Sequence, residues 1–218
     1  MIKNKLAVVI PTRGNRERFL DFSLKRLNEQ TLKPDEIIIV NDKPRSNNKD
    51  IAWRYKVGLQ RAKEKKCNAV IFWEDDDWYS IDYIEWLYKK WIEYNSPFLF
   101  GIDETYYYHI RVNKYNYMKH PQRSSAFCMI VNPSEVLKCN WPKDDYPFLD
   151  LHLWRNHKGT AISFGDRVRA IGIKHGIGMV GGGGHNINFK WTNHKAYDWF
   201  INIIDKESLN FYNSIEWK

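Results

Sequence analysis

The chain of 218 residues is 43% hydrophobic and 28% charged, a composition that favours one globular domain with a sizeable core. Its formal charge of +8 is spread along the chain and favours an anionic partner: a nucleotide, a membrane surface or a nucleic acid. No apolar run approaches the ~20 residues needed to cross a bilayer, which excludes a transmembrane helix.

Membrane and redox features are sparse in this sequence. The apolar stretch near the amino terminus has only the length of a strand before Pro11. We therefore expect a cytoplasmic protein with no integral membrane association. Cys67, Cys128 and Cys139 are widely separated and form no CxxC pair, so neither a disulfide framework nor a thiolate zinc site is indicated. We expect them to be small buried hydrophobes.

The first half of the chain alternates strand-like and helix-like segments. Continuous β-branched apolar runs predict buried strands at 6–11, 35–42 and 68–73. Apolar residues at helical spacing predict helices at 15–30, at 50–66, and from Ser80 as N-cap to about Tyr94. This order predicts an open α/β fold with a parallel sheet, whose ligands bind beyond the carboxyl ends of the strands. The three loops that follow these strands should converge there.

The second half of the chain is less regular. It contains a predicted strand at 126–131, an acidic turn before Asp150, and a loop at 171–185 that holds seven glycines. No internal repeat or Pro/Ser-rich linker divides the chain. We therefore predict a single domain, 1–218, with a nucleotide half at about 1–100 and a partner half at about 101–218.

Four acidic residues, Glu74 to Asp77, follow the third predicted strand. In an extended segment Glu74 and Asp76 would share one face, and Asp75 and Asp77 the other. Two ionised carboxylates ~4 Å apart repel by about 4 kcal/mol at an effective dielectric near 20, so the cluster needs a cation or a raised pKa. Carboxylate oxygens suit Mg²⁺ or Mn²⁺. The alternative is a solvated acidic loop that caps the next helix.

The first hundred or so residues resemble a known family. The opening of family 2 glycosyltransferases of the GT-A fold is similar to VVIPTRGNRERFLDFSLKRLNEQTLKPDEIIIVND, and their DxD region is similar to EDDDW. The resemblance implies a GT-A type open, mostly parallel sheet flanked by helices, with a less regular acceptor half. It also implies metal-dependent transfer of a sugar from a nucleoside diphosphate sugar to a hydroxyl acceptor, with Mn²⁺ or Mg²⁺ as cofactor.

Roles for the first two loops follow from the resemblance. It implies that Pro11, Thr12 and Arg13 line the pocket for the nucleotide base and ribose. It also implies that Asp42 accepts a hydrogen bond from a base N–H. Many members carry a second Asp after this position, where the present chain has Lys43, so the nucleotide preference is left open.

Roles for the acidic cluster follow in the same way. The resemblance implies that Asp76 contacts the metal, with Glu74 at the first DxD position, where the family usually shows Asp. The working pair is either Glu74 with Asp76 or Asp75 with Asp77. We favour the first pair as metal ligands with help from Asp77, and we assign Asp75 to the nucleotide sugar.

An inverting sugar transfer needs a general base beside the acceptor hydroxyl. In the resemblance this role falls to an acidic residue shortly before a helix in the second half, and Asp150 fits that position. Asp144 and Asp145 compete for the role, although each can also serve as a turn residue. Asp150 is the predicted base.

The glycine-rich loop carries Lys174, His175 and His185. Glycines let backbone N–H groups approach a phosphate, and a Lys or His can offset the charge of a leaving diphosphate. We predict that Lys174 and His175 contact the nucleotide sugar. His185 is the candidate third metal ligand, as late histidines are in several GT-A enzymes. A surface lid with exposed histidines is the alternative interpretation.

The predicted function is sugar transfer, and its acceptor divides into two classes. A glycan or small molecule is favoured by the resemblance, whereas a hydroxymethylated base in DNA is favoured by the basic charge and the many aromatic residues. Two other functions compete with sugar transfer. One is nucleic-acid binding by a GT-A fold without catalysis, and the other is nucleotidyl transfer with release of pyrophosphate.

Overall fold

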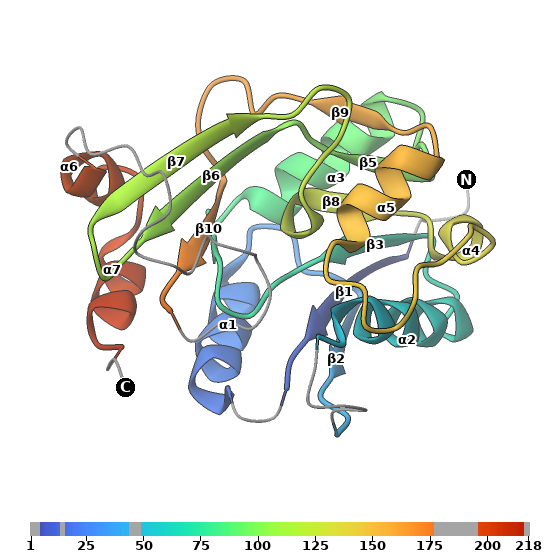
Figure 1. Ribbon diagram of the computed structural model, residues 1–218, viewed down its shortest axis with the longest axis horizontal. Coiled ribbons are helices and arrows are strands. Elements are labelled where there is room, and N and C mark those ends of the chain that lie inside the picture. The colour runs from blue at the N-terminus through green and yellow to red at the C-terminus, as the bar shows by residue number, and fades with distance from the viewer. Residues whose placement is uncertain (1–4, 14–15, 44–48, 177–195, 216–218) are drawn as a thin grey trace.

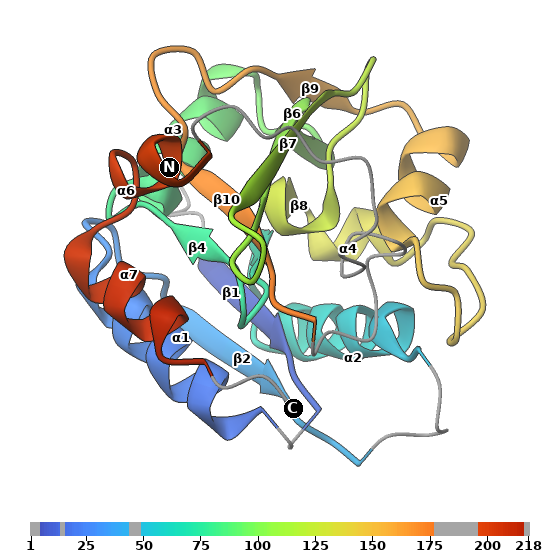
Figure 2. The same ribbon diagram turned by 60° about the vertical axis from the view of Figure 1, so that its left-hand side comes forward.

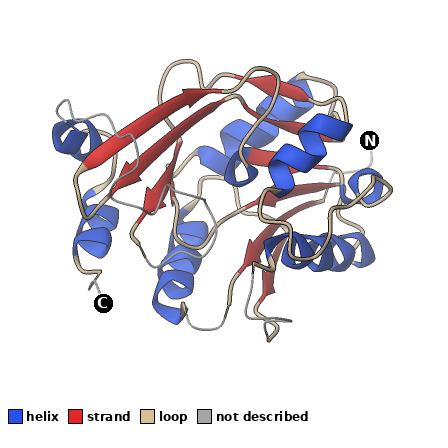
Figure 3. Ribbon diagram, viewed as in Figure 1, coloured by secondary structure: helices blue, strands red, loops and turns tan. Residues whose placement is uncertain are grey.

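The computed structural model describes residues 5–13, 16–43, 49–176 and 196–215. Its strands form two sheets, and helices lie on both sides of the larger one (Figure 3). Within the described ranges the larger sheet has six strands in the order β2-β1-β3-β8-β5-β9. They are β1 (Leu6–Pro11), β2 (Glu36–Val40), β3 (Ala69–Phe72), β5 (Leu99–Ile102), β8 (Met129–Val131) and β9 (Thr160–Ile162).

The larger sheet is mixed and mostly parallel. β1 pairs in parallel with β2 and with β3, and β5 pairs in parallel with β9. Only β8 runs antiparallel to its neighbours in this sheet, β3 and β5, among the strands described. The predicted α/β architecture with a mostly parallel sheet is thereby confirmed, and the three strands predicted from apolar runs form its first half.

Helices cover both faces of this sheet (Figure 1). One face packs against α1 (Glu17–Glu29) and α3 (Tyr83–Glu93). The opposite face packs against α2 (Ile51–Glu64), α4 (Pro133–Val136) and α5 (Leu149–Asn156). No helix in the described part of the chain combines the length and the apolar character that a membrane span requires.

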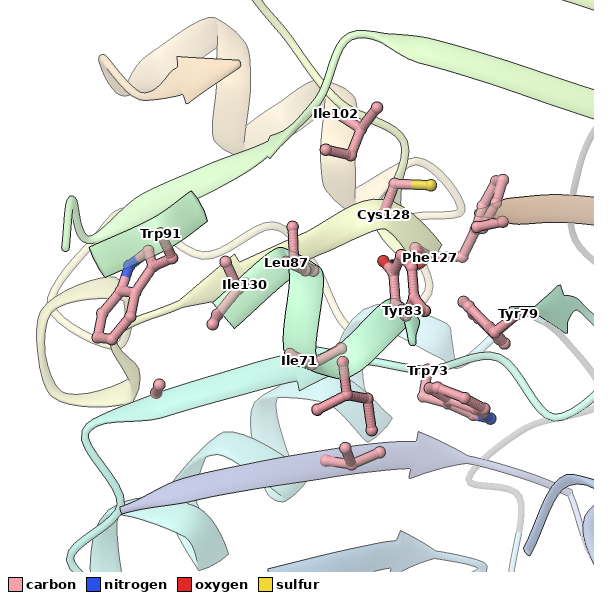
Figure 4. Close-up of a cluster of buried hydrophobic side chains, with 14 of the residues drawn as sticks. Ile71, Trp73, Tyr79, Tyr83, Leu87, Trp91, Ile102, Phe127, Cys128 and Ile130 are labelled. Carbon is pink, nitrogen blue, oxygen red and sulfur yellow. Dashed lines mark hydrogen bonds between the residues drawn. The ribbon is translucent and has the colours of Figure 1, made fainter. Parts of the chain in front are cut away.

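The core beneath α3 shows how the apolar runs are used. Leu87 and Trp91 of this helix pack with Ile71 of β3 and Ile130 of β8, and all four side chains are at most 2% exposed (Figure 4). Burying a side chain of this size contributes about 1.5–3 kcal/mol to folding. The alternating faces of β3 are both apolar because helices cover the sheet on both sides.

Two details of the predicted elements were wrong. Ser80 does not cap the third helix, because Asp82 occupies the N-cap position and the Ser80 hydroxyl donates to its carboxylate over 2.7 Å. The predicted strand at 126–131 is extended only from Met129 onward. Its first three residues form a 3₁₀ turn, closed by a 3.0 Å hydrogen bond from the N–H of Cys128 to the carbonyl of Ser125.

The smaller sheet has four strands in the order β4-β10-β6-β7. They are β4 (Trp78–Tyr79), β6 (Glu104–His109), β7 (Lys114–Lys119) and β10 (Ala170–Lys174). β10 runs antiparallel to β4 and parallel to β6. β4 begins six residues after β3 ends, so the acidic segment connects the two sheets.

Two carboxyl-terminal helices, α6 (Ala196–Ile201) and α7 (Lys206–Asn213), pack against the smaller sheet. Figure 2 shows α7 lying beside α1. Arg26 of α1 donates to Asp205, the N-cap of α7, over 2.9 Å. Phe22 of α1 stacks on Phe211 of α7 with ring centroids 3.9 Å apart. The end of the described chain is thus attached to the first helix of the chain.

We predict that Gly58→Ala destabilises the fold by about 1–3 kcal/mol, as overpacking of a core does. A Cβ at this position of α2 would lie 2.3 Å from Cγ1 of Val9, a fully buried residue of β1. This clash outweighs the ~1 kcal/mol by which Ala favours a helix over Gly. Urea denaturation measures the change, with Glu64→Ala on the exposed side of the same helix as the control. Equal stability of Gly58→Ala and wild type would contradict the prediction.

Candidate active site

The carboxyl ends of β1 and β2 are tied together by one buried arginine. The guanidinium of Arg54, which is 1% exposed, donates to the carbonyls of Thr12, Val40 and Asp42 over 2.6–2.9 Å. It also donates to the carboxylate of Asp50 over 2.8 Å. Buried carbonyls need donors, and here a single side chain supplies them to two loops.

The residues predicted to line the nucleotide pocket lie around this arginine. Pro11 is the last residue of β1. Arg13 pairs with Asp50 at 3.0 Å. Asp42 does not stand alone, because both of its carboxylate oxygens accept from Arg61, at 3.0 and 2.9 Å. The four predicted residues of these two loops are therefore gathered at one edge of the sheet.

The acidic segment is a turn and not an extended strand. The chain leaves β3 at Phe72, and the N–H of Asp77 approaches the carbonyl of Glu74 at 3.4 Å. The predicted alternation of faces is therefore wrong, because the turn brings Asp77 round to the side of Glu74 and Asp76. Carboxylate oxygens of these three residues all lie within 4.8 Å of one another. We call Glu74, Asp76 and Asp77 the acidic triad.

Aromatic rings close the base of this turn. Trp73, just before the triad, stacks on Tyr79, just after it, with centroids 3.8 Å apart. The Tyr79 hydroxyl also accepts from the N–H of Glu74 over 3.0 Å. Trp73 and Tyr79 appear side by side in Figure 4. The turn is thereby anchored on both sides in the hydrophobic core.

Cations from two distant segments face the acidic turn. Arg16, in the loop after β1, pairs with Asp75 at 3.0 Å and also contacts the carboxylate of Asp76. Nε2 of His175, just after β10, lies 2.7 Å from the same oxygen of Asp76. Lys174 is also largely buried, and its charge acts on all three triad carboxyls.

Burial and neighbouring charges divide the carboxyls into two kinds. Burial is the main reason that the pKa of Glu74 rises to about 7 and that of Asp75 to about 6. It also raises the pKa of Asp77 well above its usual range. For Asp76 burial acts in the same direction, but the guanidinium and imidazole that contact it outweigh burial and hold its pKa well below its usual range. One carboxyl is firmly ionised among three that resist ionisation.

The triad fits a divalent cation. Its donors are all carboxylate oxygens, which Mg²⁺ and Mn²⁺ prefer. Oδ1 of Asp77 accepts from the N–H of Ile173 over 2.8 Å, whereas its buried Oδ2 has no hydrogen-bond partner among the residues described. A cation would satisfy that oxygen and relieve the repulsion within the triad. His185, the predicted further ligand, lies outside the described residues.

The predicted base lies at the start of a helix on one face of the larger sheet. Asp150 is in the first turn of α5, and its carboxylate lies 3.4 Å from the guanidinium of Arg123. Burial raises its pKa above the usual value of an aspartate. The competing residues Asp144 and Asp145 are exposed and lie in the turn before α5. The structure therefore distinguishes Asp150 from its competitors by burial.

Two residues of the site were missed by the sequence analysis. Arg16 is one of many basic residues spread along the chain, and its place just after the first predicted strand was the one usable signal. Tyr107 of β6 gave no signal at all within a run of three tyrosines. Burial is the main cause of its raised pKa, and the charges of Asp150 and the triad raise it further, so it lies within electrostatic range of both.

We predict that Glu74→Gln is more stable than wild type above pH 7 in the absence of divalent metal, by roughly 1–3 kcal/mol. The folded state keeps a proton on Glu74 up to about pH 7, whereas the unfolded chain releases it near 4.5. The protonated carboxyl of Glu74 thus contributes its full stabilisation below pH 4.5, and this contribution is lost as the pH rises to about 7. The difference between the two proteins should vanish below pH 4.5. Thermal denaturation across this pH range measures it.

We predict the opposite effect for Asp76→Asn. This substitution leaves Arg16 and His175 facing a neutral amide. We therefore expect the free energy of unfolding to fall by about 3 kcal/mol at pH 8 without metal. Mn²⁺ should raise the melting temperature of wild type and should do so less in either variant. Equal and same-signed effects of the two substitutions would contradict this account of the site.

Comparisons with known proteins agree with this architecture. In an alignment of 140 positions, the chain is 28% identical to Glycosyltransferase GlyA of Streptococcus pneumoniae, and the match covers 53% of this chain and 20% of that protein. The crystal structure of S. aureus TarS 1–349 in complex with UDP-GlcNAc superposes with a TM-score of 0.55 at 12% identity, over 78% of this chain and 59% of that one. TarS 1–349 in complex with UDP superposes with a TM-score of 0.54 at 14% identity, over 78% of this chain and 60% of that one.

The chain thus spans only part of each of these proteins, about a fifth of GlyA and about six tenths of TarS 1–349. No family model matches it. The likeness to TarS concerns the fold, and the likeness to GlyA concerns the sequence of about half the chain. Together they confirm that this chain resembles glycosyltransferases and that its fold is of the GT-A type.

Proposed function

We propose that the chain is a glycosyltransferase that moves a sugar from a nucleoside diphosphate sugar to a hydroxyl acceptor. The observation that carries this proposal is the acidic triad, held in a turn between two sheets and facing buried basic groups. Such a site suits a diphosphate, because negative charge on both protein and ligand can be balanced there. The likeness to GlyA and TarS supports the same chemistry.

The donor is proposed to be a uridine diphosphate sugar. TarS 1–349 was solved with UDP-GlcNAc and with UDP, and the present chain has the same fold. The base and ribose would bind in the half at about 1–100, at the edge where Pro11, Thr12, Arg13 and Asp42 are gathered. Parallel α/β sheets bind ligands at this carboxyl edge.

Glu74, Asp76 and Asp77 would hold the Mn²⁺ or Mg²⁺ ion, which when bound neutralises the diphosphate leaving group. The chain also supplies fixed positive charge at the same place. Lys174 is 7% exposed and lies at the end of β10, and His175 follows it. We assign Lys174 to the diphosphate. His175 pairs with Asp76, and Arg16 pairs with both Asp75 and Asp76. His175 and Arg16 therefore set the charge of the turn.

Asp150 is proposed as the general base of an inverting displacement. Its carboxylate takes the proton of the acceptor hydroxyl, and that oxygen attacks the anomeric carbon as the bond to the diphosphate oxygen breaks. The proton ends on Asp150 and the electron pair on the diphosphate. Burial makes the carboxylate a stronger base, while the guanidinium of Arg123 orients it.

The acceptor remains one of two classes. A glycan or small molecule agrees with the likeness to glycosyltransferases, whereas a hydroxymethylated base in DNA agrees with the net charge of +8. A protein that bound nucleic acid without catalysis would not need a buried acidic triad. The two acceptor classes are distinguished by the assay below.

We predict that the protein with Mn²⁺ slowly hydrolyses one member of a panel of uridine diphosphate sugars to UDP. Asp76→Asn should lower this rate at least 100-fold, because the triad loses its firmly ionised carboxylate. Chromatography of the released UDP measures the reaction. Absence of hydrolysis and of any thermal shift with every donor would refute the proposed function.

We predict a separate effect for Asp150→Asn. Transfer to the acceptor, tested with simple glycans and with plain and hydroxymethylated DNA, should fall 100-fold or more, while the affinity for UDP stays within about twofold of wild type. Asp144→Asn and Asp145→Asn, in the exposed turn before α5, are the matched controls and should transfer normally. Normal transfer by Asp150→Asn would assign the base elsewhere.

A further inference from the structure

Tyr107 of β6 lies where the two sides of the proposed site meet. The charges of Asp150, Asp77 and Glu74 all act on its hydroxyl. It therefore stands within electrostatic range of the proposed base and of two members of the triad. Tyr106, its neighbour in the strand, points to the opposite face and stacks on Trp199 of α6.

The ring of Tyr107 is held by a glycine. Gly172 of β10 is its partner in the parallel pairing of β10 with β6. A Cβ on Gly172 would lie 2.4 Å from Cδ1 and 2.5 Å from Cε1 of Tyr107, distances that real side chains do not adopt. The ring of Phe127 lies 5.9 Å away on a tilted plane. The absence of a side chain at Gly172 thus creates the space that the ring occupies.

Buried polar groups lie near the hydroxyl end of the ring. The Ser125 hydroxyl acts to lower the pKa of Tyr107, so the two groups are close neighbours. The Ser125 hydroxyl lies 2.8 Å from that of Thr105, which lies 3.0 Å from Nε2 of His120. Ser125, Thr105 and His120 are each at most 5% exposed. The tip of the ring therefore lies beside a buried polar cluster.

What the fixed ring supports is a buried ammonium. Nζ of Lys174 lies 4.6 Å from the centroid of the Tyr107 ring, which is a cation–π distance. The positive charge of Lys174 lowers the pKa values of Glu74, Asp76 and Asp77, so it acts on the whole triad. Among the residues that the structure describes, this ammonium forms no salt bridge, and it lies against the face of the Tyr107 ring.

We propose that Tyr107 is a positioning residue whose ring holds the ammonium of Lys174 beside the triad, where the diphosphate of the donor binds. This inference rests on the proposed function. It assigns the effect to the ring face and not to the hydroxyl. Gly172 then leaves the space for the ring, and Lys174 is the group that contacts the donor.

The test compares four variants by calorimetric titration with UDP in the presence of Mn²⁺. Tyr107→Leu should weaken UDP binding about tenfold, as loss of a buried cation–π contact does, whereas Tyr107→Phe should stay within about twofold of wild type. Gly172→Ala should act in the same direction as Tyr107→Leu, because it displaces the ring. Tyr106→Leu is the matched control from the same strand and should bind UDP normally.

A double substitution separates positioning from general damage. Tyr107→Leu should add less than twofold to the loss caused by Lys174→Met, because the ring acts only through the ammonium. Donor hydrolysis should show the same pattern, and Tyr107→Leu should raise KM by a larger factor than it lowers kcat. Melting temperatures identify any variant that has lost its fold, and Gly172→Ala, which displaces the same ring, carries the test if Tyr107→Leu has.

Several results would overturn the inference. Equal losses in Tyr107→Phe and Tyr107→Leu would assign the role to the hydroxyl, and an equal loss in Tyr106→Leu would show a general effect on β6. Normal UDP binding by Tyr107→Leu or by Lys174→Met would remove the role altogether while leaving the proposed function standing. A wild-type protein that neither binds UDP nor hydrolyses any donor would overturn both.

Discussion

Burial of three carboxyls next to a fourth, partly buried one is the constraint on which this molecule depends. Each ionised pair at ~4 Å costs about 4 kcal/mol at an effective dielectric near 20, and the turn offers no room for the charges to separate. The fold answers with Arg16 from the loop after β1 and with Lys174 and His175 from the end of β10. Both sheets must therefore be complete before the turn between them is electrostatically tolerable.

The two sides of the site are built by different means. At the carboxyl ends of β1 and β2, Arg54 satisfies carbonyls of both loops, so backbone positions are set by one buried guanidinium. On β6 and α5, Tyr107 and Asp150 are set by side-chain packing and by single polar partners. Under the proposed function the nucleotide would bind where the backbone is fixed, and the groups beside the diphosphate and the acceptor would be set by individual side chains.

Local patterns of apolar residues were sufficient to predict the strands in the first half of the chain, but they could not predict the contacts within the candidate site. β1, β2 and β3 were predictable because uninterrupted apolar runs are typical of strands covered on both faces. The alternation expected of the acidic segment failed because a turn, closed by Trp73 and Tyr79, replaces the strand there. Contacts such as that between Asp76 and His175 join residues 99 positions apart, and periodicity carries no information about them.

The acidic turn also has a mechanical position. β3 before it belongs to the larger sheet, β4 after it belongs to the smaller one, and the Trp73 and Tyr79 rings fasten the two strands to each other. The single residue Asp103, between β5 and β6, is a second short connection of the same kind. A rotation of one sheet against the other would act on both connections, and at the turn it would change the spacing of the carboxylate oxygens. The geometry of the acidic triad is thus coupled to the relative position of the two sheets.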